Sequence, residues 1–318
     1  MKQNKLGKTN ISVSEIGFGA LTIGPWQLNL SLAEGADIIS YAIERGINFI
    51  DTAQYYKTYD YVNLAINRTN KEIIISSKSL ETSYEGMKLA VEEARKSMNR
   101  DLIDIFLLHE IREGNDWISR SGAWEYLKEA KSKNLVKAIG ISTHHVDVAA
   151  EASLVDDIDI MFPIINFKSL GIRNGSGVGT KEEMHKSILL NENAGKGLYA
   201  MKVFGGGNLS GHFLEALNYV RSLDCFDSMM LGFSSTHELD NIFDYCMNNL
   251  PTDFIPDVKS KKIRVDLGDC IGCGNCVERC PNRAITLDFN RQASINEDNC
   301  LTCGYCSPIC PVFAIVMF

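Results

Sequence analysis

The sequence has no long apolar run, no basic run and no apolar leader. No segment of its 318 residues approaches about eighteen uninterrupted apolar positions, the least that a membrane-spanning helix needs. The formal net charge of -8 offers no attraction to nucleic acid or to an anionic membrane surface. The chain opens on the polar stretch Met1–Lys5 rather than on a signal sequence. We therefore expect a cytoplasmic protein with no nucleic-acid or membrane partner.

A further absence concerns nucleotide-binding folds. No G-x-G-x-x-G follows the first apolar run, which disfavours a Rossmann domain. Instead, short apolar runs alternate with helix-period segments down to about residue 250, and this alternation predicts an α/β fold. The expected strands are Glu15–Leu21, Asn48–Thr52, Glu72–Ser77, Ile103–Leu108, Lys137–Ser142, Asp159–Asn166, Gly197–Val203 and Ser228–Gly232. Eight such strands predict an eight-stranded parallel β/α (TIM) barrel over residues 1–250.

Cysteine is concentrated near the end of the chain, where C-x-x-C-x-x-C-x-x-x-C-P occurs twice. Bacterial ferredoxins hold 4Fe-4S clusters with this spacing, and there the fourth cysteine of each run ligates the other cluster. The expected ligands are Cys270, Cys273, Cys276 and Cys310 for one cluster, and Cys300, Cys303, Cys306 and Cys280 for the second. Disulfides would require an oxidising compartment, and zinc closes on a single group of four ligands. Cys225 and Cys246 lie in apolar segments and are expected to be buried thiols.

The pattern of the barrel breaks at Pro251. We interpret residues 251–262 as a linker and residues 263–318 as a small α+β ferredoxin-like domain with two clusters. Each cysteine run is followed by apolar residues, 284–287 and 314–317, which predict one strand over each cluster.

Titratable residues follow three successive predicted strands of the barrel. Asp51 ends the second strand, Lys78 follows the third and His109 follows the fourth, with Tyr55 and Tyr56 just beyond Asp51. The carboxyl ends of barrel strands meet at one mouth, where active sites lie. A free tyrosine ionises near pH 10, so we expect a neighbouring cation, Lys78, to favour its phenolate.

Four segments give the chain a family resemblance, namely residues 6–9, 14–19, 46–53 and 104–109. Residues 1 to about 245 resemble an aldo-keto reductase, and the whole chain resembles the iron-sulfur branch of that superfamily with a fused ferredoxin domain. The resemblance implies a catalytic tetrad of Asp51, Tyr56, Lys78 and His109, in which Tyr56 delivers a proton to the substrate carbonyl. Tyr55 is chemically identical, and the five-residue offset from Asp51 favours Tyr56.

The resemblance also implies contacts to a nicotinamide cofactor. They are Ser142, Thr143, Asn166, Lys202, Gly205, Gly206, Gly207, Ser234, Ser235 and Asn241. Thr143 stands where the family usually has asparagine, and the glutamine that commonly ends the sixth strand is missing, with Asn166 as its substitute. The cations that pair with a 2'-phosphate are also missing, which leaves NADH and NADPH both open. We find no flavin motif.

Three functions compete on this basis. The first is an oxidoreductase that reduces an aldehyde or ketone, or oxidises the alcohol, with NAD(P)H, while the clusters exchange electrons with a ferredoxin or another carrier. The second is a ferredoxin-dependent reductase fed through the clusters without nicotinamide, and the third is a non-catalytic nucleotide-binding redox sensor. Because the ferredoxin unit replaces the extension with which many aldo-keto reductases close over their substrate, we expect one cluster to lie near the barrel mouth.

Overall fold

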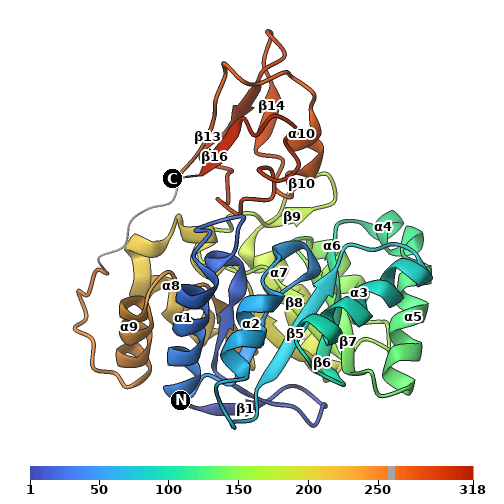
Figure 1. The fold of residues 1–318 in the computed structure, drawn as a ribbon, viewed down its shortest axis with the longest axis vertical. Coiled ribbons are helices and arrows are strands. Elements are labelled where there is room, and N and C mark those ends of the chain that lie inside the picture. The colour runs from blue at the N-terminus through green and yellow to red at the C-terminus, as the bar shows by residue number, and fades with distance from the viewer. Residues whose placement is uncertain (257–261, 318) are drawn as a thin grey trace.

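The computed structural model describes residues 1–256 and 262–317, and its centre is a closed barrel of parallel strands (Figure 1). Neighbouring strands pair in the order β11, β12, β3, β4, β5, β6, β7 and β8. Their bounds are β3 Ile16–Gly19, β4 Phe49–Asp51, β5 Ile74–Ser79, β6 Ile103–Ile111, β7 Val136–Thr143, β8 Ile160–Pro163, β11 Gly197–Ala200 and β12 Ser228–Leu231. The predicted barrel is confirmed, and each predicted strand differs from the observed one by only a few residues at its ends.

A helix follows every barrel strand and covers its outside. These helices are α1 Leu32–Glu44, α2 Tyr59–Ile66, α3 Tyr84–Ser97, α5 Ser121–Ser132, α6 Val146–Ala152, α7 Lys181–Asn193, α8 Phe213–Ser222 and α9 Thr236–Cys246, with the short α4, Gly114–Ser119, before α5. Helices α1 and α7 begin with capping boxes, in which Ser31 pairs with Glu34 and Thr180 with Glu183. Two of the remaining helices, α2 and α6, have too few turns to give a clear apolar period in the sequence.

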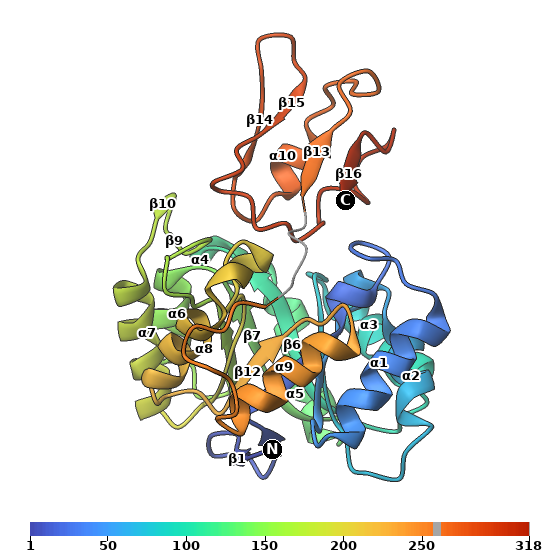
Figure 2. The same ribbon diagram turned by 90° about the vertical axis from the view of Figure 1, so that its left-hand side faces the viewer.

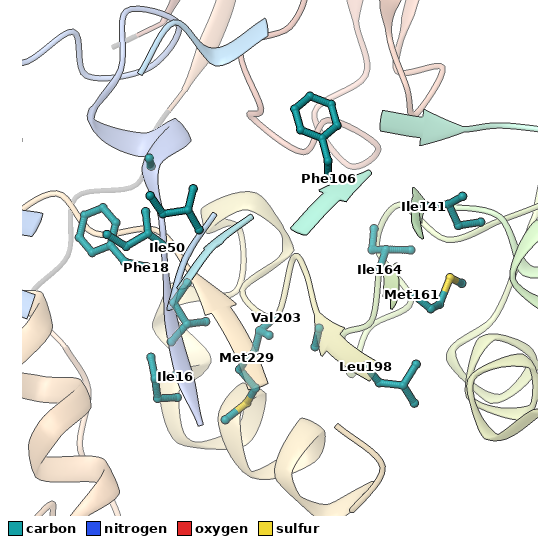
Figure 3. Packing of buried hydrophobic residues seen from close by; sticks show 14 of the residues in the cluster. Ile16, Phe18, Ile50, Phe106, Ile141, Met161, Ile164, Leu198, Val203 and Met229 are labelled. Atoms are coloured by element: carbon teal, nitrogen blue, oxygen red, sulfur yellow. The ribbon is translucent and has the colours of Figure 1, made fainter. Parts of the chain in front are cut away.

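Successive residues of each barrel strand serve two different hydrophobic cores. Phe49, Ile74 and Ile105 belong to the core inside the barrel. Their neighbours Ile50, Ile75 and Phe106 belong to the larger core between barrel and helices. Figure 3 labels members of this outer core, among them Ile50 and Phe106. Side chains alternate along a strand, so this register decides which residues at the strand ends point inward.

The two ends of the barrel are closed differently. The hairpin of β1 (Gln3–Lys5) and β2 (Ser12–Ser14) lies at one end, and the C-terminal unit lies over the other (Figures 1 and 2). Among the described helices, none has the length and apolarity of a membrane span.

The C-terminal unit consists of two small antiparallel pairs around a short helix. β13 (Ile263–Val265) pairs with β16 (Ile315–Met317), β14 (Ile285–Leu287) pairs with β15 (Ala293–Ile295), and α10 covers Asn275–Arg279. The strands predicted after each cysteine run are therefore β14 and β16. Residues 257–261, which belong to the predicted linker 251–262, lie outside the described residues, as does residue 318.

Candidate active site and cluster sites

The strand register carries Asp51, Lys78 and His109 into the mouth of the barrel. Asp51 lies two residues beyond the inward-facing Phe49 on β4, and His109 lies two residues beyond the inward-facing Leu107 on β6. Lys78 is four residues beyond Ile74 on β5 and shares its face. The three side chains are almost fully buried. An acid, an amine and an imidazole therefore converge because the inward face of each strand changes from apolar to polar at its carboxyl end.

Lys78 and Asp51 form a buried ion pair. The ammonium of Lys78 donates to a carboxylate oxygen of Asp51 at 2.5 Å and to the carbonyl of Thr52 at 2.9 Å. Burial lowers the pKa of Lys78 and raises that of Asp51, while the attraction between the two charges opposes both shifts. The pair therefore holds Lys78 in one place without exposing it to water.

Tyr56 reaches the ion pair from a 3-10 turn, Gln54–Tyr56, that directly follows β4. The ammonium of Lys78 lies 4.8 Å from the centre of the Tyr56 ring. The pKa of Tyr56 nevertheless lies well above 10, because burial and then the charge of Asp51 disfavour the phenolate. In this arrangement the ammonium of Lys78 does not bring the pKa of Tyr56 down towards neutral pH, because burial and the charge of Asp51 outweigh it.

His109 is held as a neutral imidazole. Burial, followed by the charge of Lys78, lowers its pKa well below 6.5. Its ring lies edge-on to the Tyr56 ring, with ring centres 5.5 Å apart. Within the described residues the Nδ1 atom of His109 has no hydrogen-bond partner, whereas Nε2 points to the mouth of the barrel. A neutral imidazole in this position can donate one hydrogen bond to an oxygen beside Tyr56.

These side chains line a cavity of about 510 Å³ that extends from the tetrad to the start of α9. Six of the predicted cofactor contacts lie on its wall, namely Ser142, Lys202, Gly206, Gly207, Ser234 and Ser235. Tyr56 lies on this wall as well. The hydroxyl of Tyr55 instead donates to the backbone carbonyl of Tyr305 at 2.9 Å. Geometry thus separates the two tyrosines that the sequence left as alternatives.

The other four predicted contacts, Thr143, Asn166, Gly205 and Asn241, lie outside this lining. The hydroxyl of Thr143 donates to the carbonyl of Ile111 at 2.6 Å. The amide of Asn166 bonds both backbone groups of Leu170 at 2.8 Å and so closes a turn. Thr143 and Asn166 are structural side chains here, because their polar atoms are already satisfied by backbone.

Glu238, which the sequence did not single out, lines the cavity at its far end. Its carboxylate accepts the backbone N–H of Ser234 at 2.6 Å, in the first turn of α9. A negative charge therefore stands where the resemblance placed the adenosine end of the cofactor.

The eight clustered cysteines line two separate cavities of the C-terminal unit. Cys270, Cys273, Cys276 and Cys310 line one. Cys280, Cys300, Cys303 and Cys306 line the other. These are the two interleaved sets that the spacing predicted, with the fourth cysteine of each run crossing to the other site.

Both cysteine sets present sulfur donors of the kind that hold iron-sulfur clusters. All ten cysteines are unpaired, and no three His, Cys, Asp or Glu side chains of the described chain could share one metal ion. Backbone N–H groups donate to the sulfurs of Cys270, Cys280 and Cys310 at 3.3–3.4 Å. Such bonds stabilise thiolates and help to set the potential of a cluster. Burial raises the pKa of Cys306, so that thiol needs a bound cation to ionise.

The second cysteine set adjoins the mouth of the barrel. Cys303 lines the same cavity as Tyr56 and His109. Thr302 donates its hydroxyl to the carbonyl of Gly206 at 2.5 Å, and Asn208 donates to the carbonyl of Cys300 at 2.6 Å. The expectation that one cluster site lies near the barrel mouth is confirmed.

A buried ion pair joins the two units next to this contact. Arg279 of α10 donates to the carboxylate of Glu110 at 3.0 Å, and the side chains of Arg279 and Glu110 are only 12% and 4% exposed. Arg112 also donates to Glu110, at 2.8 Å. The guanidinium of Arg279 lies over the rings of Tyr55 and Tyr305, 4.9 and 4.6 Å from their centres.

Fold and site thus define a β/α-barrel protein with a polar cavity at its mouth and a unit with two tetracysteine sites beside it. The sequence profile of the Aldo/keto reductase family matches residues 15–222, and that of a 4Fe-4S dicluster domain matches residues 263–317. The chain belongs to the aldo/keto reductase family and carries a 4Fe-4S dicluster domain.

Similar proteins agree with this assignment. YqkF of Bacillus subtilis, an uncharacterized oxidoreductase, is 27% identical over 214 residues, which cover 64% of this chain and 68% of YqkF. Methylglyoxal reductase DkgA of Escherichia coli is 29% identical over 154 residues, which cover 46% of this chain and 52% of DkgA. The chain thus spans about two thirds of the first relative and half of the second.

Two solved structures share the fold. AKR11C1 of Bacillus halodurans in its holo form has a TM-score of 0.62 at 22% identity, covering 76% of this chain and 89% of AKR11C1. PA4992 of Pseudomonas aeruginosa has a TM-score of 0.63 at 20% identity, covering 75% of this chain and 92% of PA4992.

Proposed function

We propose that this protein reduces an aldehyde or ketone with a reduced nicotinamide cofactor, using Asp51, Tyr56, Lys78 and His109. One observation carries the proposal: the hydroxyl of Tyr56 and Nε2 of His109 meet at one point of the cavity, beside the buried Lys78–Asp51 pair, and burial raises the pKa of Tyr56 and lowers that of His109. A phenol that keeps its proton is suited to donate it to an oxygen that gains charge.

The chain's own residues divide the work as follows. Tyr56 and His109 orient the substrate oxygen, and Tyr56 transfers its proton to that oxygen as the carbonyl is reduced. Lys78, fixed by Asp51, lies under the Tyr56 ring and offsets the negative charge that proton transfer leaves there. The nicotinamide supplies the hydride when it is bound.

The wall of the cavity offers polar groups to a dinucleotide. Ser142 lies at the tetrad end, Gly206 and Gly207 lie along the wall, and Ser234 and Ser235 lie at the far end. Glu238 at that end disfavours a 2'-phosphate and suits a ribose hydroxyl, so the proposal specifies NADH rather than NADPH. The two cysteine sets hold 4Fe-4S clusters, which supply one-electron transfer when bound.

A second candidate follows from the position of Cys303. A cluster ligand that shares a cavity with Tyr56 and His109 supports a reductase fed from a ferredoxin through the clusters without nicotinamide. Leu301 favours this candidate too, because its backbone carbonyl packs where a side chain on Gly206 would stand, against the loop expected to receive the cofactor's phosphates.

Turnover under anaerobic conditions separates the two candidates. Protein with both clusters reconstituted is mixed with NADH or NADPH and a panel of carbonyl compounds that includes methylglyoxal, the substrate in DkgA's name. Nicotinamide absorbance and the electron paramagnetic resonance of the clusters are followed together. The proposal expects NADH oxidation that depends on the carbonyl compound, whereas reduction only by chemically reduced ferredoxin would establish the second candidate.

Replacing Tyr56 tests the assignment of the proton donor. Tyr56→Phe should lower kcat about 100-fold or more, because general acid catalysis contributes on the order of 10²–10⁴. Tyr55→Phe serves as the matched variant, since it removes a neighbouring hydroxyl that bonds backbone instead of facing the cavity. Equal turnover by Tyr56→Phe and the unaltered protein would refute the tetrad.

A further inference from the structure

The hydroxyl of Tyr305 stands between the two groups that should hold the substrate carbonyl. It lies 3.0 Å from the hydroxyl of Tyr56 and 3.2 Å from Nε2 of His109. Tyr305 belongs to the C-terminal unit, between the cluster cysteines Cys303 and Cys306. One oxygen from the cluster loop thus meets both donors that the carbonyl oxygen would need.

Tyr305 is held at this point by contacts at both ends of the residue. Its backbone N–H bonds the sulfur of Cys303, and its carbonyl accepts the hydroxyl of Tyr55 at 2.9 Å. The guanidinium of Arg279 covers the ring of Tyr305, and Tyr305 is only 6% exposed. The position of the phenol is therefore built into the docked arrangement of the two units and is not a chance rotamer.

We propose that the Tyr305 hydroxyl occupies the subsite of the substrate's carbonyl oxygen, and that a carbonyl compound binds by displacing it. The proposal deepens the proposed function, since it assigns an internal competitor to the same site. Two oxygens cannot both bond the Tyr56 hydroxyl and Nε2 of His109 at one point, so the phenol leaves before the carbonyl engages. Tyr305 lines the 510 Å³ cavity, and displacement requires its ring to turn away from Arg279 into that space.

This competition selects among ligands by how strongly their acceptor atom binds hydrogen-bond donors. When a ligand displaces the phenol, Tyr56 and His109 lose their hydrogen bonds to Tyr305. The ligand's own oxygen must replace both bonds. A polarised carbonyl oxygen accepts more strongly than a phenol oxygen does, whereas an ether or thioether group restores less. Tyr305 is thus a specificity-determining residue for strong oxygen acceptors.

The variant Tyr305→Phe isolates the hydroxyl and keeps the ring that packs against Arg279. We expect KM for a carbonyl substrate of the unaltered protein to fall about threefold to tenfold, with kcat within about twofold, because one or two modest hydrogen bonds no longer compete. Tyr59→Phe is the control: Tyr59 is equally buried, and its hydroxyl bonds Ser77 at 2.8 Å away from the cavity lining. Tyr59→Phe should leave KM unchanged.

A binding measurement tests the competition without turnover. Acetate, whose oxygen can accept from both donors, is titrated calorimetrically into the cluster-loaded, oxidised protein. Acetate should bind Tyr305→Phe about threefold to tenfold more tightly than the unaltered protein. Adding Tyr56→Phe to that variant should remove most of the gain.

The outcomes distinguish this proposal from the proposed function. Equal acetate affinities, including no binding to either protein, would overturn the competition. So would a tenfold lower kcat at unchanged KM in Tyr305→Phe, since the hydroxyl would then serve the reaction itself. If no variant reduces a carbonyl compound yet acetate still prefers Tyr305→Phe, the proposed function fails while the shared subsite stands.

Discussion

The ion pair between Glu110 and Arg279 should decide how firmly the C-terminal unit is docked on the barrel. Replacing Glu110 with Gln leaves Arg279 buried beside two aromatic rings with no anion in contact. Among the described residues, Nε and Nη2 of Arg279 already have no hydrogen-bond partner, so no other acceptor is in place to take over.

The size of the effect follows from the burial of each group. Removing one partner of a buried pair costs on the order of 3–5 kcal/mol, a large share of the roughly 5–15 kcal/mol that stabilises a typical domain. Arg279→Met should cost less, about 1–3 kcal/mol, because Glu110 keeps Arg112 at 2.8 Å. The double variant should cost less than the sum of the two, by roughly 0.5–3 kcal/mol.

Two optical signals report the two units separately. All three tryptophans, Trp26, Trp117 and Trp124, lie in the barrel, so their fluorescence follows barrel unfolding in urea. Visible absorbance of the clusters follows the C-terminal unit. Glu110→Gln should move the cluster transition to lower urea more than the tryptophan transition.

An exposed ion pair provides the control. Glu85 pairs with Lys88 at 3.4 Å on the surface of α3, and Glu85→Gln should change neither transition by more than about 0.5 kcal/mol. A cost below about 1 kcal/mol for Glu110→Gln, or full additivity with Arg279→Met, would refute the view that this pair joins the units.

Three further predictions concern the site and its surroundings. Lys78→Met should lower kcat about 100-fold or more in steady-state assays. It should also lower the free energy of unfolding in urea by about 3–5 kcal/mol, because the buried carboxylate of Asp51 loses its ion-pair partner. Gly206→Ala should loosen the cluster loop, because the φ of Gly206 is +75° and a new Cβ would lie 1.8 Å from the carbonyl oxygen of Leu301. The variant should lose its cluster absorbance at a lower temperature. Gly211→Ala, where a Cβ meets nothing within 4 Å, should leave that temperature unchanged. Burial holds the pKa of His144 well below 6.5, so below pH 6.5 the unfolded chain binds a proton that the folded chain does not. The free energy of unfolding therefore has its full contribution from neutral His144 above pH 6.5 and falls as the pH is lowered. His144→Asn should therefore reduce the dependence of barrel unfolding free energy on pH below 6.5 by up to about 1.4 kcal/mol per pH unit, and an unchanged slope would contradict the buried neutral imidazole.

The parts of the site that depend on spacing within one segment could be predicted from the sequence. Asp51, Lys78 and His109 share a mouth because a two-residue period carries the inward face to the end of each strand. The crossing of Cys280 and Cys310 between the two cluster sites follows from the double C-x-x-C-x-x-C-x-x-x-C-P run. Both inferences need only regular local geometry.

The parts that depend on how the two units dock could not be predicted in this way. Tyr305 looks like a spacer residue in the sequence, and nothing in its neighbourhood shows that it reaches Tyr56. Glu110 and Arg279 are 169 residues apart, so their pairing carries no local signal. The pKa of Tyr56 depends on burial in the same way: its proximity to Lys78 could be foreseen from the strand ends, but not the burial that raises its pKa.

The loop from Cys300 to Cys306 belongs both to the second cysteine set and to the mouth of the barrel. Cys300, Cys303 and Cys306 line the second cysteine cavity, and Cys303 and Tyr305 line the cavity at the barrel mouth. If the second set holds a cluster as proposed, the loop that binds it also carries Tyr305 to its place beside Tyr56 and His109. Loss of that cluster would then release the loop that sets Tyr305 against Tyr56, so metal binding and the shape of the cavity depend on the same few residues.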